Sequence, residues 1–342
     1  MVGRSKGASC LPAGPKELIL AVVAGIDEAG YGPVLGPMVV SAVAFSLPDE
    51  LAGVSMWRLL AGVVSRKPGK RHGRVAINDS KKLYSGLRGK EGLVNLERGV
   101  LAMMAAQQGP PRSLEELLDR ICPQAVEQLA RYPWYAGADM PLPGCLSETD
   151  VKLSANAISA EMKRIPMDLR LVRAEPIFTG EYNHILQATR NKSSVLFDVT
   201  CRLLMHLWQH ASDGMLRIVI DRQGGRMRYL PGLQRAFDGC QFKVMDESEA
   251  LSAYRITDGP RSAELYFLIN AEQRHLPAAL ASMVSKYLRE LFMLLFNRFW
   301  ANQMPDISPT AGYYSDGNRF YREIQPVMRQ LGLDAQLVYR RR

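Results

Sequence analysis

Two apolar segments of the sequence end in carboxylates. Asp27 and Glu28 follow the run 18–26, and Asp221 closes the run Met215–Asp221. A charge left alone at the end of a buried strand is costly, and acids brought together raise one another's pKa. A divalent cation removes both costs, because hard cations such as Mg²⁺ prefer oxygen ligands. These residues therefore predict a metal site. The alternative is that each acid caps its strand or pairs with a surface lysine.

The elements around these acids indicate an α/β fold that begins with a hairpin. Leu18–Asp27 is predicted to be a buried strand, the glycines and prolines of 30–37 a turn, and Met38–Phe45 a second strand. The turn is not a dinucleotide-binding loop, because it lacks the G-x-G-x-x-G spacing and no helix follows it.

Further strands and helices are predicted along the chain. Short apolar runs indicate strands, and helical periodicity with few breakers indicates helices. The predicted strands are Met215–Asp221, Phe242–Met245 and Ala263–Asn270, and the predicted helices are Ser194–His210, Pro277–Trp300 and Asn318–Leu331, with another that starts near the N-cap Ser113. Residues 1–16 are expected to be a flexible tail.

Six sequence blocks, in order, resemble the ribonuclease HII and ribonuclease HIII family. The most specific block is Gly25-Ile-Asp-Glu-Ala-Gly-Tyr-Gly-Pro-Val-Leu-Gly-Pro-Met-Val-Val40. The others are Asn78-Asp-Ser-Lys-Lys-Leu83, Ile185-Leu-Gln-Ala-Thr189, Ile220-Asp221, the stretch from Glu272 to Lys286, and Pro309-Thr-Ala-Gly-Tyr313. The blocks span roughly residues 18–325 of the chain.

The resemblance implies an RNase H-like fold, in which helices flank a mixed five-stranded sheet and the C-terminal part is helical. It also implies an endonuclease that hydrolyses the RNA strand of RNA/DNA hybrids, or cuts at ribonucleotides embedded in duplex DNA, and leaves 3′-hydroxyl and 5′-phosphate ends. Two Mg²⁺ or Mn²⁺ ions serve such a reaction at the attacking water and at the leaving oxygen. By resemblance, the ligands and catalytic residues are Asp27, Glu28, Asp221 and Glu272.

The same resemblance implies substrate contacts. The loop Gly30, Tyr31 and Gly32 would offer backbone groups to the ribose 2′-hydroxyl, the group that distinguishes RNA from DNA. Tyr313 would pack on the neighbouring sugar. Ser80 and Lys81 would contact backbone phosphate, which positions a duplex without reading its sequence.

Three features depart from the family pattern. Tyr31 stands where the loop usually carries Arg or Lys. If that basic side chain binds phosphate in the family, its replacement weakens substrate binding here. Glu272 stands where the fourth acid is usually Asp, and a misplacement of about 1 Å can cost about 100-fold in rate; Asp246 and Glu247 are rival fourth acids. A segment around 105–180 has no counterpart in the family, and its acidic part is expected to be a surface elaboration.

Composition and charge narrow the class of protein. The 342 residues carry 43 Lys and Arg against 34 Asp and Glu, and the net charge of +9 favours a polyanionic partner. The positive charge is local: residues 58–98 hold eleven basic and three acidic side chains, whereas 111–150 hold three and seven. Five scattered cysteines without a CxxC pair indicate reduced thiols and a cytoplasmic protein. No apolar stretch approaches the ~18 residues of a membrane span.

We therefore expect residues 17–300 to form a catalytic domain and 301–342 a helical, basic segment that completes the substrate site, in a monomeric protein of DNA replication and repair. Two alternatives stay open: a catalytically weakened nucleic-acid-binding protein, and an RNase H-like nuclease with a DNA substrate. His206 and His210 lack a third metal ligand nearby, and His275 is a candidate for proton transfer one turn after Glu272. Arg340–Arg342 are expected to form a solvated tail.

Overall fold

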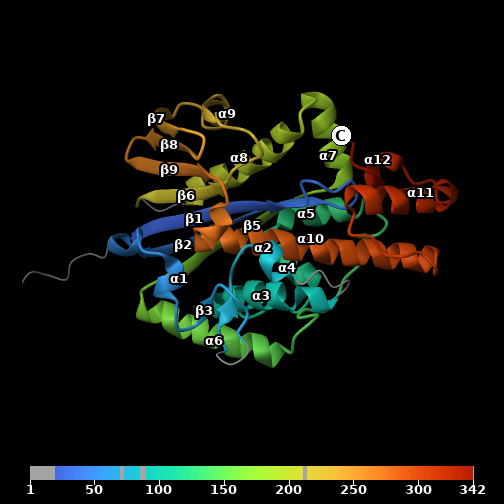
Figure 1. Ribbon diagram of the computed structural model, residues 1–342, viewed down its shortest axis with the longest axis horizontal. Helices are drawn as coiled ribbons and strands as arrows, with labels where there is room; N and C mark the ends of the chain where they lie inside the picture. The colour runs from blue at the N-terminus through green and yellow to red at the C-terminus, as the bar shows by residue number, and fades with distance from the viewer. Residues whose placement is uncertain (1–19, 70–72, 85–89, 211–213, 342) are drawn as a thin grey trace, which may run out of the picture.

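Seven strands form one mixed sheet, in the order β5-β2-β1-β6-β9-β8-β7 (Figure 1). The computed structural model describes residues 20–69, 73–84, 90–210 and 214–341, so the expected tail 1–16 and Arg342 lie outside the described residues. The strands are β1 Leu20–Ala29, β2 Met38–Pro48, β5 Asp168–Ile177, β6 Leu216–Asp221, β7 Gln241–Glu247, β8 Leu251–Asp258 and β9 Arg261–Leu268. β1, β6 and β9 run parallel to one another, whereas the other pairings are antiparallel. The predicted mixed α/β fold is confirmed.

The sheet has two strands more than the five expected. Both additional strands, β5 and β8, carry charged residues among the apolar ones, such as Arg170 and Arg173 in β5 and Arg255 in β8. Because charged residues interrupt the apolar ones, continuous apolar runs did not predict these two strands. The end of the segment 105–180, for which an insertion was expected, pairs with β2 as an edge strand of the central sheet. A separate short pair, β3 Val64–Ser65 and β4 Val75–Ala76, lies outside this sheet.

One face of the sheet packs against helices α7 Thr179–Thr189, α8 Lys192–His210 and α9 Leu230–Ala236, and the other against the long helix α10 Leu276–Gln303 (Figure 1). Gly25 explains how close α10 comes to β1. A Cβ atom at this position would stand 2.1 Å from the backbone nitrogen of Ala278, so only glycine permits this contact. The long predicted helix is thus confirmed, and its first turn lies on the strand that carries Asp27.

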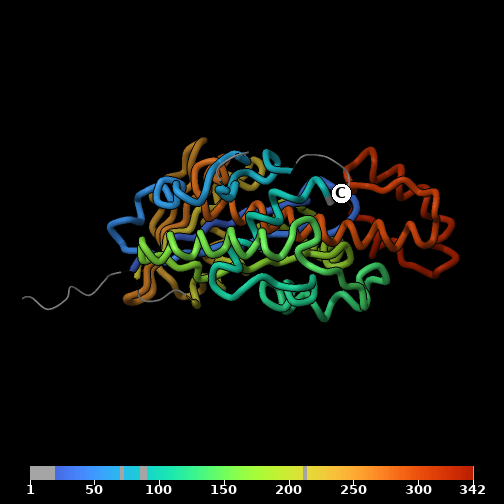
Figure 2. Tube along the Cα trace, turned by 90° about the horizontal axis from the view of Figure 1, so that it is seen from below, coloured from blue at the N-terminus to red at the C-terminus, as the bar shows by residue number. Residues whose placement is uncertain are grey.

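A further layer of helices covers α10 on its outer side, as Figures 1 and 2 show. The layer contains α3 Val94–Gln108, α4 Leu114–Ile121 and α6 Glu148–Arg164. The remaining helices are α1 Met56–Leu59, α2 Ser80–Leu83 and α5 Pro123–Leu129, and the short 3-10 turns are η1 Asp49–Leu51, η2 Lys90–Leu93 and η3 Ala271–Gln273. Ser113 caps α4 as predicted, since its hydroxyl accepts the amide of Glu116 at 3.2 Å.

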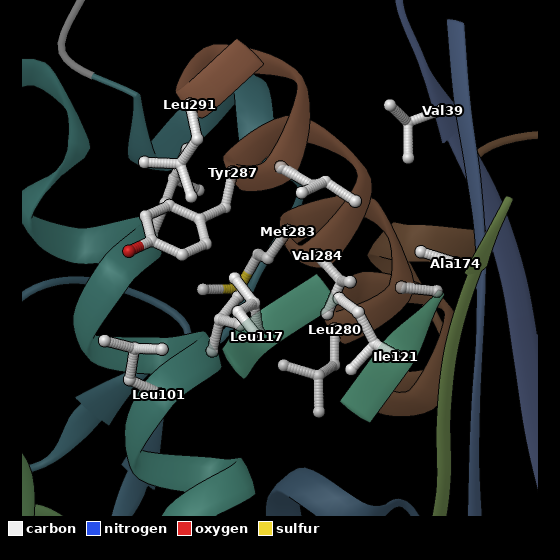
Figure 3. Close-up of a cluster of buried hydrophobic side chains, with 14 of the residues drawn as sticks. Val39, Leu101, Leu117, Ile121, Ala174, Leu280, Met283, Val284, Tyr287 and Leu291 are labelled. Atoms are coloured by element: carbon white, nitrogen blue, oxygen red, sulfur yellow. The ribbon is translucent and has the colours of Figure 1, made fainter. Parts of the chain in front are cut away.

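The acidic segment 111–150 is part of the hydrophobic core and not a surface elaboration. The side chains of Tyr132, Trp134 and Tyr135 are buried. The segment joins the core because the apolar stripe of α4 packs toward α10. Figure 3 shows this cluster, in which the labelled side chains of α10 are Leu280, Met283, Val284, Tyr287 and Leu291, and those of α3, α4, β2 and β5 are Leu101, Leu117, Ile121, Val39 and Ala174.

The C-terminal segment is folded back onto the loop between β1 and β2 (Figure 1). Helices α11 Tyr314–Gln330 and α12 Ala335–Val338 lie at one end of the molecule, and β7, β8 and β9 lie at the other (Figure 2). After α12, the amide of Arg340 donates to the carbonyl of Val34 at 2.8 Å. Arg340 is buried, with 1% of its surface exposed, so the expectation of a solvated tail is wrong for this residue.

Two further expectations can be compared with the described residues. Cys122 and Cys201 are buried thiols, as expected for reduced cysteines inside a core. Among the helices that the structure describes, none combines the length and the apolar character needed to cross a bilayer.

Candidate active site

Asp27 and Asp221 lie side by side at the carboxyl ends of two parallel strands. Ile26 of β1 is in register with Ile220 of β6, so the next residue on each strand is an aspartate. Neighbouring strands stand about 4.8 Å apart, and residues at one level of a sheet point to one face. The sheet pairing therefore brings together two acids that are 194 positions apart in the sequence.

Glu272 joins these two acids through the turn that follows β9. The amide of Ala271 donates to an Asp221 carboxylate oxygen at 2.9 Å, and the carboxyl groups of Asp221 and Glu272 are in hydrogen-bonding contact. Glu272 is buried, and its Oε2 atom has no hydrogen-bond partner. Arg66 holds this turn from the other side, because its Nη1 donates to the carbonyl of Gln273 at 2.7 Å.

The rival fourth acids lie elsewhere. Asp246 and Glu247 belong to β7, the edge strand of the sheet. The carboxylate of Glu247 accepts the hydroxyl of Tyr254 at 2.6 Å. The structure therefore places Glu272, and not either rival, beside Asp221.

Burial and mutual repulsion raise the pKa of the clustered acids. Burial raises the pKa of Asp27 well above its ordinary value, and the charges of Glu28 and Asp221 raise it further. The pKa of Glu28 rises to about 7, through burial and then the charge of Asp221. Burial also raises the pKa of Asp221 to about 6, and the neighbouring Glu272 contributes to this rise. Protons or cations would offset this accumulation of buried negative charge.

Lys81 and Ser80 reach the same cluster from α2. The carboxylate of Asp79 caps this helix by accepting the amide of Lys81 at 2.9 Å. The Lys81 ammonium interacts with the charges of Asp27, Glu28 and Glu272. Ser80 lies one hydroxyl away from Asp27, because Ser282 hydrogen-bonds to the Asp27 carboxylate and its Oγ stands 3.1 Å from the Ser80 Oγ.

The predicted loop and Tyr313 lie on two sides of the buried Arg289. Gly30 has φ +83°, and a Cβ there would stand 2.6 Å from Arg289 Nε. Arg289 donates to the carbonyl of Ala311 at 2.9 Å, and its guanidinium lies 5.7 Å from the Tyr313 ring. Half of the Tyr313 surface is exposed. The C-terminal Arg340 holds the loop itself, because its Nη1 donates to the Gly30 carbonyl at 2.7 Å.

Sequence reasoning missed Arg66, Arg289 and Arg340. Arg289 had a signal, because it is one of few charged residues in an apolar helix, beside Lys286 and Glu290. The three form a buried cluster in which Glu290 accepts from both cations. Arg340 carried no local signal, since a terminal run of arginines is typical of a solvated tail.

The residues of the cluster suit a hard divalent cation in their chemistry. Four carboxylates supply only oxygen ligands, and a buried oxygen of Glu272 is without a partner. Burial, with like charges beside it, raises the pKa of Asp27, Glu28 and Asp221. No three His, Cys, Asp or Glu side chains of the described residues are already arranged as a metal site, so the side chains of the cluster would have to reorient around an ion.

The sequence singles out three histidines, His206, His210 and His275. His206 and His210 stack near the end of α8 with ring centroids 4.0 Å apart, and no third ligand from the described residues joins them. His275 follows the 3-10 turn that contains Glu272, its amide donates to the carbonyl of Ala271 at 2.9 Å, and it is the N-cap of α10. Burial and the charge of Arg274 lower the pKa of His275.

Comparison with known proteins yields only distant similarity. No family model and no curated protein matches the sequence. Among solved structures, the chain is similar to RNase HII in its complex with PCNA from Archaeoglobus fulgidus (15% identity, 94% of each chain, TM-score 0.41). It is also similar to ribonuclease H2 from Pyrococcus horikoshii (12% identity, 93% of this chain and 92% of that chain, TM-score 0.40). A third is Bst-RNase HIII in complex with Mn²⁺ (14% identity, 98% and 72%, TM-score 0.39). Similarity at this level assigns no activity, and the function is inferred from the site residues.

Proposed function

We propose that this protein is a metal-dependent endoribonuclease that hydrolyses the RNA strand of RNA/DNA hybrids, or cuts at ribonucleotides embedded in duplex DNA. The observation that carries the proposal is the meeting of Asp27, Glu28, Asp221 and Glu272 at the carboxyl ends of β1, β6 and β9. Carboxylates in such number are expensive to bury together unless cations or protons compensate them. Two cations held close together can assist phosphodiester hydrolysis at both the attacking water and the leaving oxygen.

The four acids would hold two Mg²⁺ or Mn²⁺ ions, which supply an activated water and stabilise the leaving oxygen of an in-line displacement. Asp27 and Asp221 lie on adjacent strands at one level, so both would contribute ligands to these ions. The Lys81 ammonium interacts with the charges of the acids and would bind the phosphate beside the scissile bond. The hydrogen bond from Ala271 orients the Asp221 carboxylate before any ion arrives.

Selection of RNA would come from the loop Gly30–Gly32 together with Tyr313. Only the 2′-hydroxyl distinguishes the two sugars along a backbone, so the contact must read that group. Arg340 holds the loop through the Gly30 carbonyl, and Arg289 holds the segment before Tyr313 through the Ala311 carbonyl. The exposed Tyr313 ring is available for a sugar. The segment 301–342 would thus complete the substrate site, as the sequence resemblance implies.

One cleavage assay tests the proposal. Three duplexes are compared with Mg²⁺ and with Mn²⁺: an RNA/DNA hybrid, DNA with a single embedded ribonucleotide, and plain DNA. The proposal requires cleavage of one of the first two, with 3′-hydroxyl products, and no cleavage of plain DNA. Hybrid binding without cleavage in either metal would favour the weakened nucleic-acid-binding protein. Cleavage of plain DNA would favour a DNA nuclease.

A further inference from the structure

Two cations surround Tyr31, the residue that replaces the usual basic side chain of the loop. The Lys192 ammonium lies 4.3 Å from the centre of the Tyr31 ring. Arg226 interacts electrostatically with Tyr31 from the segment that follows β6, and so does Glu28 of the acid cluster. Tyr31 therefore lies beside Lys192 and within electrostatic range of both Arg226 and Glu28, which come from distant parts of the sequence.

Arg226 is held in a way that leaves its charge uncompensated. Its guanidinium lies 4.6 Å from the Phe197 ring and 5.8 Å from the Tyr229 ring, and its Nη2 donates to Ser193 Oγ at 3.2 Å. In the described part of the chain it is thus held by a hydroxyl and two aromatic rings, and by no carboxylate. Aromatic faces orient a cation without removing its charge. The guanidinium is only partly buried, so an anion can reach it.

Lys192 belongs to the same cluster as Arg226. It is the first residue of α8, and the next residue, Ser193, accepts the hydrogen bond from Arg226. The Lys192 ammonium contacts the ring of Tyr31, which packs against the core beneath α8, and Arg226 is joined to the same helix end through Ser193. One helix end thus fixes the two positive charges relative to each other and to the loop.

We propose that Lys192 and Arg226 form a phosphate-binding subsite for the nucleic-acid backbone, in place of the basic side chain that the loop lacks at Tyr31. The inference rests on the proposed function and names a binding contact for that same site. A polyanionic strand that approaches four carboxylates is repelled unless cations flank them, and Lys81 provides such a cation only on the side of α2. Lys192 and Arg226 provide it on the side of α8. The Tyr31 ring orients the lysine between the acids and the bound phosphate.

The salt dependence of hybrid binding tests this subsite. Each phosphate contact that is lost lowers the slope of log affinity against log salt by about 1, whereas loss of fold or of a neutral contact does not. The experiment measures the binding of a labelled RNA/DNA hybrid to full-length Asp27→Asn protein, in which cleavage should be lost. Lys192→Ala and Arg226→Ala are introduced into this protein singly and together. We expect the slope to fall by about 1 for each single variant and about 2 for the pair. Affinity should fall about tenfold per contact at low salt.

A restoring substitution and matched controls make the test specific. Tyr31→Arg introduced beside Lys192→Ala should recover the lost slope, because it returns a cation to the loop. Lys152→Ala and Arg164→Ala remove exposed cations of α6 that pair with Glu148 and Glu161, and they should leave the slope unchanged. If Arg226→Ala lowers the melting temperature, Arg226→Gln replaces it in the test, because glutamine keeps a polar group beside Ser193 and removes the charge.

The outcomes distinguish the subsite from the proposed function. Wild-type protein that cleaves the hybrid, together with variants that keep the wild-type slope, would overturn the subsite and leave the proposed function standing. Failure of Tyr31→Arg to recover any slope would also overturn it, since the subsite is proposed to replace that charge. Wild-type protein that neither cuts nor binds a hybrid would overturn both.

Discussion

The backbone amide of Ala271 donates a 2.9 Å hydrogen bond to the carboxylate of Asp221, and this bond fixes the turn that carries Glu272 against the end of β6. It connects two acids that are separated in the sequence by α9 and the three strands β7, β8 and β9. Because the two carboxyl groups are also in contact with each other, the electrostatic state of the cluster depends on the position of one short turn.

Asp27→Asn and Asp221→Asn should each abolish metal-dependent cleavage and at the same time stabilise the metal-free protein. Cleavage is lost because each substitution removes a proposed ligand, with an expected decrease of at least about 1,000-fold. The metal-free protein becomes more stable because the substitution removes a buried negative charge that its neighbours repel. A gel-based cleavage assay and thermal melting in EDTA measure the two effects. Asp246→Asn, on β7, is the matched control and should change neither.

Addition of Mg²⁺ should stabilise the folded protein. A ligand that binds only the folded state adds about 2.7 kcal/mol at a concentration of 100 times its Kd. Differential scanning fluorimetry measures this effect. The melting temperature should rise with increasing Mg²⁺ and return to its initial value after EDTA is added. The double variant Asp27→Asn, Asp221→Asn should show no such shift. A shift of wild-type size in this variant would mean that the ion binds elsewhere.

Without metal, the stability of the protein should fall as the pH rises from 5 to 8. The folded-state pKa values of Glu28, about 7, and Asp221, about 6, exceed the ordinary values of 4.5 and 3.8. The folded protein therefore keeps protons that the unfolded chain has released. The corresponding stability is complete below about pH 4 and is lost as the pH passes 6 to 7, on the order of 1–3 kcal/mol. Urea denaturation in EDTA at several pH values measures this slope. Glu28→Gln should flatten it, and an equally steep slope in that variant would contradict the assignment.

Glu272→Asp should slow cleavage about 100-fold and leave the fold intact. The turn at Ala271–Gln273 is held in place by Asp221 and Arg66, so the shorter aspartate would withdraw its carboxylate by about 1 Å. Single-turnover cleavage at saturating enzyme gives the rate of the chemical step. Glu272→Gln, which keeps the length and removes the charge, should be slower still. Equal or faster cleavage by the aspartate variant would show that Glu272 is not a ligand.

Arg340→Met should raise the KM for a hybrid about tenfold with a change of only about 1 kcal/mol in stability. The loss of its hydrogen bond to the Gly30 carbonyl releases the loop. Burial and the charge of Arg289 lower the pKa of Arg340 to about 9, so removal of this buried cation offsets the loss in stability. Steady-state kinetics and urea denaturation separate the two effects. Arg341→Met is the control, because Arg341 is exposed and contacts Asn183 through its backbone amide. An unchanged KM would exclude a role of Arg340 at the loop.

The sequence by itself determined the elements that carry the first three acids. β1, β2, β6 and α10 were predicted close to their observed bounds, because each is a continuous apolar run with clear turn signals on at least one side. Asp27, Glu28 and Asp221 could be selected for the same reason, since a carboxylate at the end of such a run has a high desolvation cost. Local sequence contains this information because burial and strand propensity depend on neighbouring residues.

Only the tertiary structure decided which distant residues meet. The register of Ile26 with Ile220 brings the acids together, the turn after β9 selects Glu272 over Asp246 and Glu247, and burial of Arg340 joins the C-terminal segment to the loop. β5 and β8 also needed the sheet, because their charged residues stand among apolar ones and resemble surface segments until partner strands cover them. Pairing between strands and the burial of long cationic side chains depend on contacts across the whole fold, which no local pattern specifies.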